Sequence, residues 1–340
     1  MGGLNTLIGQ QRPVRLLCDA LKSGKLPHAL LFTGENGVGK TTAALELAKI
    51  CNCTEAGVRQ YTKTNEIAEP AFSACGKCRF CRKIKNGMHP DIHRIKPSGG
   101  YIRIDQIRSL YSSLALKSDA AVTRIVLIED AHRMNQEAGN ALLKILEEPP
   151  DSTVFVLTAP DTGDLLPTIV SRCRHIRFNP IPQKELADHL VRQNGLKENH
   201  AMIVALLARG SLARALDLAD ADWITYRNFI VDMLGRLHDL PASYRLAFAE
   251  MLASDRGKLE GVFEIMKNWY RDLAVFSRSP EKIYNHDLSL LVKEAAQQMP
   301  IDLIIKKSDA VIRAEKAISG NANIRLCLDA LVTKLAQNEH

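Results

Sequence analysis

The segment from Ala29 to Ile50 constrains the fold of this chain more than any other part of its sequence. A short β-rich apolar run, Ala29 to Thr33, leads into a glycine-rich turn, and a run of helical period, Ala43 to Ile50, follows at once. An apolar run of this length bounded by glycine predicts a buried strand that passes directly into a helix. Two further apolar runs, Ile125 to Ile128 and Val154 to Leu157, predict more buried strands.

These strands alternate with stretches of helical period such as Glu137 to Leu146, and the alternation predicts a parallel sheet covered by helices. After Phe178 the strand-like runs stop, and Asn179-Pro180-Ile181-Pro182 predicts a rigid linker. Nearly all of the remaining sequence has helical period. The sequence therefore predicts an α/β domain followed by two helical domains, with bounds of 1–179, 180–221 and 222–340.

Composition narrows the class of protein. The chain has 340 residues, 46% hydrophobic and 24% charged, and contains no apolar run near the roughly 20 residues that span a bilayer. The net charge of +7 permits contact with nucleic acid without requiring it. Three of the eight cysteines are clustered and others lie far apart, which is unlike a disulfide-stapled secreted domain. We therefore expect no membrane segment and a reducing, cytoplasmic location.

The glycine-rich turn, Gly34-Glu35-Asn36-Gly37-Val38-Gly39-Lys40-Thr41, fits the pattern of a phosphate-binding loop. Its glycines allow positive φ angles, which turn backbone N–H groups toward phosphate oxygens. Lys40 is expected to contact the β- and γ-phosphates, and Thr41 to place its hydroxyl on Mg²⁺. The alternative is a glycine-rich turn that binds no ligand. The residues predicted to bind ATP or ADP with Mg²⁺ are Gly34, Gly37, Gly39, Lys40, Thr41 and Thr42.

An acidic pair, Glu129 and Asp130, directly follows the strand predicted at Ile125 to Ile128. Hydrolysis of a nucleotide at the neighbouring loop needs such a pair, one carboxylate to organise Mg²⁺ and one to polarise the attacking water. Asp130 is one methylene shorter than glutamate, so it can leave the water beyond a hydrogen bond of ~3 Å. The alternative is that the pair caps the next helix.

A cluster of thiols, Cys75-Gly76-Lys77-Cys78-Arg79-Phe80-Cys81, lies downstream of Cys51 and Cys53. Four thiolates around Zn²⁺ form a closed, structural site, and the interleaved cations offset its negative charge. An iron-sulfur run wants a further cysteine where Lys85 stands, and free thiols are the other alternative. The sequence predicts a zinc module at about 51–82, held by Cys75, Cys78, Cys81 and either Cys51 or Cys53.

Four segments in one order resemble the bacterial clamp-loader branch of the AAA+ family. They are Pro27 to Phe32 before the glycine-rich loop, the cysteine module, Asn140 to Pro150 with the sequence NALLKILEEPP, and Ser171-Arg172-Cys173. The resemblance covers about residues 5–220. It implies a RecA-like AAA+ domain with an inserted zinc module, a helical lid and an all-α collar that oligomerises. It also aligns the family's cysteine with Cys53, which favours Cys53 over Cys51 as the fourth ligand.

The same resemblance implies a role for Arg172 as an arginine finger that reaches the ATP of a neighbouring subunit. A planar, permanently charged guanidinium suits that role because it can stabilise charge on γ-phosphate oxygens. The alternative is an ordinary surface or interface arginine. The family's usual acidic order is Asp then Glu, whereas this chain has Glu129-Asp130, and Ala213 occupies the place of the second-sensor arginine. These departures resemble the delta-prime branch, so we expect a weak or absent ATPase of its own.

The implied function is that of a subunit of the DNA polymerase III clamp loader, which places the sliding clamp on primed DNA during replication. The implied partners are gamma/tau-like and delta-like subunits, the clamp itself, and primer-template DNA contacted through phosphates. Two alternatives stay open on sequence alone. One is an ATP-hydrolysing gamma/tau-type motor subunit, and the other is an AAA+ remodeller unrelated to replication.

Overall fold

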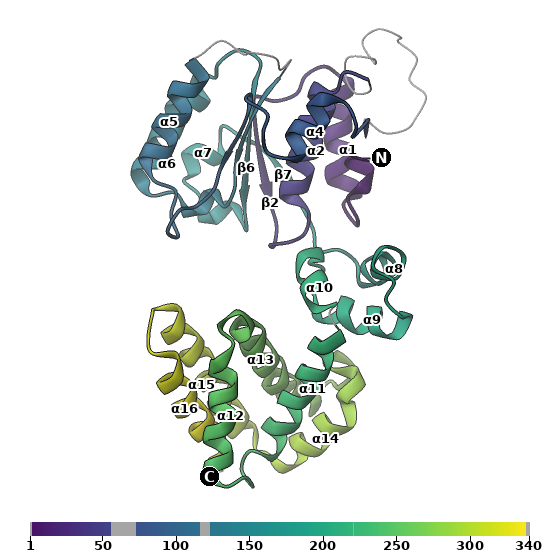
Figure 1. Ribbon diagram of the computed structural model, residues 1–340, viewed down its shortest axis with the longest axis vertical. Helices are drawn as coiled ribbons and strands as arrows, with labels where there is room; N and C mark the ends of the chain where they lie inside the picture. The colour runs from purple at the N-terminus through teal and green to yellow at the C-terminus, as the bar shows by residue number, and fades with distance from the viewer. Residues whose placement is uncertain (1, 56–72, 116–122, 220, 338–340) are drawn as a thin grey trace. The chain divides into compact units, whose positions relative to one another are not determined.

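The computed structural model describes residues 2–55, 73–115, 123–219 and 221–337 (Figure 1). They divide into two compact units: unit 1, made of Met1–Glu198 and Ala208–Ala215, and unit 2, made of Asn199–Leu207 and Leu216–His340. The division falls within the segment predicted as a lid, so the three-domain scheme with bounds at 179 and 221 stays a prediction. Within the described ranges, none of the helices combines the length and apolar character needed to cross a bilayer.

Unit 1 is built on a parallel sheet of five strands in the order β4-β5-β6-β2-β7, which confirms the predicted α/β architecture. The three predicted strands form its centre and are buried along their whole length: β2 (Ala29–Thr33), β5 (Arg124–Ile128) and β6 (Thr153–Ala159). The edge strands are β4 (Ile92–Ile95) and β7 (Arg174–Arg177); two of the four residues of β4 and three of the four of β7 are polar, and each strand buries one residue. No continuous apolar run marks them, so the sequence did not predict them.

Helices cover both faces of this sheet (Figure 1). Alternate residues of β2 serve the two faces: Leu30 and Phe32 belong to one core cluster, and Leu31 belongs to the other. The first face is covered by α1 (Gln11–Lys22), α2 (Lys40–Asn52) and α4 (Arg79–Lys85). The second is covered by α5 (Ile104–Ala115), α6 (Gln136–Glu147) and α7 (Pro167–Val170). A separate short antiparallel pair joins β1 (Gly2–Gly3) to β3 (Ser73–Ala74).

After β7, every regular element among the described residues is a helix, as the sequence predicted. The segment predicted as a lid contains α8 (Gln183–Asn194), α9 (Glu198–Leu207) and α10 (Leu212–Leu218). The helices that follow are α11 (Ala221–Arg236), α12 (Ala242–Ser254), α13 (Leu259–Phe276), α14 (Ser289–Gln298), α15 (Ile301–Ser319) and α16 (Ile324–Leu335). Trp269 and Tyr270 of α13 are buried in the core that these helices share.

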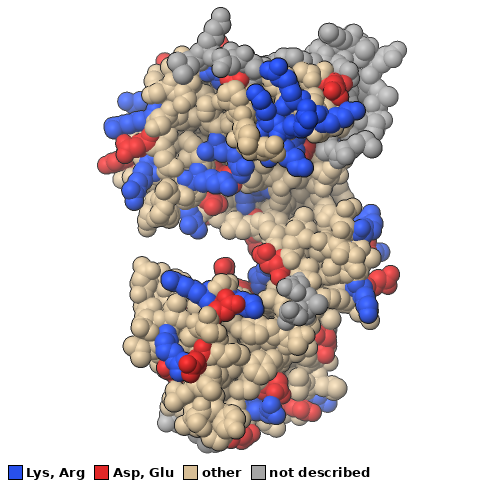
Figure 2. All heavy atoms as spheres, viewed as in Figure 1, with Lys and Arg blue, Asp and Glu red and all other residues tan. Residues whose placement is uncertain are grey.

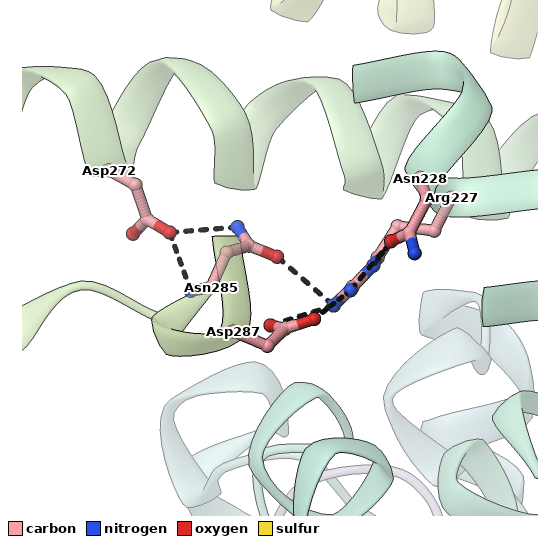
Figure 3. A network of polar contacts seen from close by, with 5 residues as sticks. All are labelled: Arg227, Asn228, Asp272, Asn285 and Asp287. Carbon is pink, nitrogen blue, oxygen red and sulfur yellow. Dashed lines mark hydrogen bonds and ion pairs between the residues drawn. The ribbon is translucent and has the colours of Figure 1, made fainter. Parts of the chain in front are cut away.

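A buried polar network ties α11 to the segment that follows α13 (Figure 3). The guanidinium of Arg227, 1% exposed, forms an ion pair with Asp287 and donates to the side chains of Asn228 and Asn285. Asp272 is fully buried, and its carboxylate accepts three hydrogen bonds of 2.8 Å, from the backbone N–H of Tyr284 and from both the backbone and the side-chain amide of Asn285. Each buried charge therefore has partners on another segment, which fixes these segments relative to each other.

We expect the Asp272→Ala variant to lower the free energy of unfolding by about 3–5 kcal/mol, because it removes one partner from a buried charged network and leaves the donors unpaired. Chemical denaturation followed by circular dichroism measures this change. Asp232→Ala is the matched control, since its ion pair with Arg236 is exposed and should matter by less than about 1 kcal/mol. Equal stability of the Asp272 and Asp232 variants would contradict a structural role for this network.

Candidate functional site

The glycine-rich loop connects the end of the central strand β2 to the start of α2. Gly34, Gly37 and Gly39 all have positive φ, at 139°, 80° and 104°. At Gly34 a Cβ atom would lie 2.3 Å from the carbonyl oxygen of Phe178, so only glycine fits there. No side chain among the described residues caps the N-terminus of α2, which leaves its first backbone N–H groups available to a ligand. This is the geometry of an anion-binding cradle.

Lys40, the first residue of α2, is held inside this loop. Its ammonium group donates to the carbonyl oxygens of Gly34 at 2.5 Å and Glu35 at 2.8 Å, and the residue is 6% exposed. Burial lowers the pKa of Lys40, while the charges of Asp130 and Glu35 oppose that effect. Thr41 beside it is half-buried and Thr42 is exposed. The structure thus gathers the six residues predicted to contact nucleotide at one end of β2.

The two acidic residues after β5 have different surroundings. The Glu129 carboxylate accepts from Arg94 at 2.7 and 3.1 Å and lies 3.7 Å from the ammonium of Lys96. Asp130 has a left-handed backbone, with φ 51°, and its N–H donates to the hydroxyl of Thr158 at 3.0 Å. The charge of Asp130, like that of Glu35, also acts on Lys40. Glu129 is therefore neutralised by cations on and just after β4, and Asp130 is coupled to the loop.

The alternative interpretation of this acidic pair, that it caps the next helix, is wrong. Asp130 precedes a single 3-10 turn, Ala131–Arg133, without accepting a capping hydrogen bond from it. The cap of α6 is Asn135, whose side chain accepts from the N–H of Ala138 at 2.9 Å. Because a different residue supplies the cap, the acidic side chains are left for other contacts.

The start of α10 lies directly on the glycine-rich loop. The N–H of Leu212 donates to the carbonyl oxygen of Gly37 at 2.9 Å, and a Cβ atom at Gly37 would lie 2.1 Å from the hydroxyl of Ser211 and 2.8 Å from the methyl group of Ala213. Ala213, the residue in the place of the second-sensor arginine, therefore faces the loop. Arg214 projects roughly 100° away around the helix. The sequence did not show that Gly37 is needed for this close packing.

The cysteine cluster forms where α2 ends and α4 begins. The sulfur atoms of Cys53, Cys75, Cys78 and Cys81 all lie within 4.8 Å of one another. A tetrahedral zinc site with bonds of about 2.3 Å separates its sulfurs by about 3.8 Å, so the four sulfurs lie near the spacing that such a site needs. Backbone N–H groups of Cys75 and Cys78 point at the sulfurs of Cys53 and Cys75, at 3.4 and 3.2 Å. Four thiol ligands arranged in this way could hold a metal ion.

Cys51 stays outside this group, although it is only two residues from Cys53 and is also buried. Cys51 lies in the last turn of α2, whereas Cys53 follows the helix with an extended backbone that carries its sulfur toward the cluster. Burial raises the pKa of Cys51 to about 12. Burial also acts to raise the pKa of Cys78, but hydrogen bonds from Cys81 and Thr54 outweigh it and lower the pKa to about 6. The geometry therefore favours Cys53 as the fourth ligand.

Arg172 lies in the tight turn between α7 and β7. The N–H groups of Arg172 and Cys173 donate to carbonyl oxygens of α7 at 3.1 and 3.2 Å, which continues the helical turn through this segment. The guanidinium donates to the carbonyl oxygen of Thr168 at 3.0 Å and pairs with the carboxylate of Glu147 at 2.5 Å. The arginine side chain is 35% exposed. The turn thus presents a positioned, accessible guanidinium, and Glu147 is a partner that the sequence did not reveal.

The model of a family described as "DNA polymerase III, delta subunit" matches residues 9–182, about half of the chain. The chain belongs to this DNA polymerase III subunit family. The matched range contains the glycine-rich loop, the acidic pair, the cysteine cluster and Arg172.

Relatives of this DNA polymerase III family member carry three subunit names. DNA polymerase III subunit delta' of Bacillus subtilis is 30% identical over 338 residues, which cover 96% of each chain. Subunit tau of the same organism is 25% identical and matches 98% of this chain but 61% of its own length. A solved structure of a gamma subunit-related protein from Thermotoga maritima covers 95% of this chain and 99% of its own, at 21% identity and a TM-score of 0.47.

The sequence comparisons bear out the predicted kinship with the delta-prime branch of the bacterial clamp-loader subunits. Tau and gamma subunits are relatives as well, so the motor alternative concerns a protein of the same family. The sequence relatives are delta', tau and gamma subunits of DNA polymerase III, which favours a replication subunit over the alternative of an AAA+ remodeller unrelated to replication.

Proposed function

We propose that this chain is a delta-prime-type subunit that donates Arg172 to the ATP site of a neighbouring subunit in the clamp loader. In this proposal its partners are gamma/tau-like and delta-like subunits, the sliding clamp, and primer-template DNA. The complex opens the ring-shaped clamp and closes it on primed DNA. ATP binding and hydrolysis in neighbouring subunits set the order of these steps.

The observation that carries the proposal is the way Arg172 is held. Its guanidinium is partly exposed on a short turn, fixed by Thr168 and Glu147, and does not depend on a flexible loop. A finger that acts on another protomer must be preorganised and still reachable. Thr168 and Glu147 engage only part of the fork of donors on Arg172, which leaves other N–H groups available for phosphate oxygens.

The chain's own nucleotide site supports binding more than hydrolysis. Its glycine-rich loop has the backbone needed to hold the phosphates of ATP or ADP, with Thr41 available to Mg²⁺. The acid in the metal-organising position, Glu129, is engaged by Arg94 and Lys96, and Asp130 has the shorter side chain. We infer a bound nucleotide with weak or absent turnover, and a role for it in the stability of the subunit.

In the same proposal the four-cysteine cluster holds a structural zinc ion, which leaves no open position for catalysis. The helices of residues 180–221 act as a lid and those of residues 222–340 as an oligomerising collar. The metal would link the end of α2 to α4, next to the core that supports the glycine-rich loop.

Two variants separate this proposal from the gamma/tau-type motor. We expect Lys40→Ala to remove the binding of a fluorescent ATP analogue by the purified chain, because it removes the ammonium group that the cradle needs. ATP turnover by the reconstituted complex should then change little, while Arg172→Ala lowers it strongly. A motor subunit predicts the reverse, with most turnover lost in the Lys40 variant. Arg192→Ala is the control, since this exposed arginine of α8 bonds to a carbonyl of its own helix.

A further inference from the structure

The helix α4 divides into two faces of opposite character. At roughly 100° per residue, one side of the helix collects its apolar residues and the other collects its cations. The apolar side carries Phe80, which is half-buried, and Cys81 and Ile84, which are buried against the core. With the preceding Lys77, the charged side forms what we call the basic face: Lys77, Arg79, Arg82, Lys83 and Lys85, all exposed.

No acidic residue lies near these cations in the sequence, since residues 73–90 contain neither aspartate nor glutamate. Figure 2 shows a dense group of lysine and arginine side chains on unit 1, where Figure 1 places α4. Elsewhere in unit 1, Arg94, Arg124 and Arg172 each have a carboxylate partner. Within the described part of the chain, none of the five cations of the basic face forms an ion pair. The face is therefore a positive surface without internal compensation.

The charge exceeds what a metal site would need. A zinc ion with four thiolates carries two negative charges, and the basic face carries five positive ones, an excess of three. Support of the metal therefore accounts for only part of this surface, and the excess faces solvent.

The residues of the basic face indicate whether its acidic partner is a protein or a nucleic acid. Protein interfaces depend on buried apolar or aromatic anchors. Helix α4 offers none on its exposed side, because its one aromatic residue, Phe80, packs against the core and has the guanidinium of Arg79 over its ring. A phosphodiester backbone needs no such anchor, since several lysines and arginines in a row suffice to displace its counterions. The observations therefore favour nucleic acid over an acidic protein.

We propose that the basic face of α4 binds the phosphate backbone of DNA without reading its sequence. This proposal rests on the proposed function and deepens it, because it names a surface for the DNA partner; the contact itself needs neither ATP nor another subunit. It would give the cysteine module a task in the assembly: to hold one phosphate-binding helix rigidly on the sheet domain.

The test uses the purified full-length chain and fluorescein-labelled DNA, as a duplex and as a single strand, with anisotropy measured over a series of salt concentrations. We expect binding with a Kd of about 10⁻⁴–10⁻⁶ M near physiological salt, weakening steeply as salt rises. In the variant that combines Arg82→Ala, Lys83→Ala and Lys85→Ala, affinity should fall by about tenfold or more. The slope of log K against log salt should fall by about two to three, close to one for each phosphate that a side chain no longer neutralises.

Control variants separate the effect of the charges on α4 from a general effect of substitution on folding. The combined variant Lys306→Ala, Arg313→Ala and Lys316→Ala removes three exposed cations from α15 and should leave the slope unchanged. Exchanging the cation types, with Arg82→Lys, Lys83→Arg and Lys85→Arg, should retain both affinity and slope. Unchanged binding in the α4 alanine variant would overturn the proposal. So would tighter binding of poly-glutamate than of DNA at equal charge, since the face would then be a site for acidic protein.

Discussion

Replacing Arg172 by alanine should lower ATP hydrolysis at the neighbouring site by about 10³-fold or more, because an arginine finger stabilises charge on the transferred phosphoryl group. Turnover by the whole reconstituted complex should fall accordingly if that site is needed for each cycle. Arg172→Lys should recover little, since an ammonium group lacks the planar fork that contacts two oxygens at once. The loss should lie in kcat, with a small change in KM, because the contact forms chiefly in the transition state.

The ion pair between Arg172 and Glu147 provides a second variant for this experiment, Glu147→Gln. The amide keeps the shape of the side chain and removes the charge that pairs with Arg172 at 2.5 Å. We expect an intermediate loss of turnover, about tenfold, if Glu147 positions the guanidinium for its neighbour. Assembly of each variant complex, checked by gel filtration, separates a lost finger from a lost interface. Normal assembly together with normal turnover in the Arg172 variant would remove the mechanism proposed for this subunit.

The sequence predicted those parts of the fold that are specified locally. The central strands β2, β5 and β6 are buried on both faces, so each stands out as an apolar run. The edge strands β4 and β7 place charged residues on exposed positions and gain their extended form from pairing with β5 and β2. That pairing depends on tertiary structure, which no local pattern records.

In the candidate site too, the sequence predicted what local spacing defines and missed what tertiary structure brings together. Residues that act through the backbone of one loop, such as Gly34 and Lys40, were predictable because their spacing alone defines the cradle. The partners of charged residues were not: Arg94 meets Glu129 and Glu147 meets Arg172 across 35 and 25 residues of sequence. Spacing also left Cys51 and Cys53 as equal alternatives. The choice depended on the backbone after α2, which turns only Cys53 toward the other sulfurs.

Those two cysteines allow a sharp prediction about the metal. We expect about one zinc ion per chain by elemental analysis, lost in Cys53→Ala and in Cys81→Ser and retained in Cys51→Ala. Structural zinc sites in small domains bind with about 10–16 kcal/mol near neutral pH, so loss of one thiolate removes much of a large free energy. Cys51 and Cys53 are both buried, at 5% and 0% exposure, so truncating either side chain to alanine should lower the stability of the fold by a similar amount.

The effect of the metal should extend beyond the cluster. Cys53 terminates α2, the helix that begins with Lys40, and Cys78 and Cys81 belong to the same core cluster as residues of that helix. Loss of zinc should therefore lower the melting temperature of the chain by several degrees and weaken nucleotide binding, whereas Cys51→Ala should change only the former. Retention of zinc by Cys53→Ala, or metal-free protein after careful preparation of the unmodified chain, would show that these four thiols pack as an ordinary core.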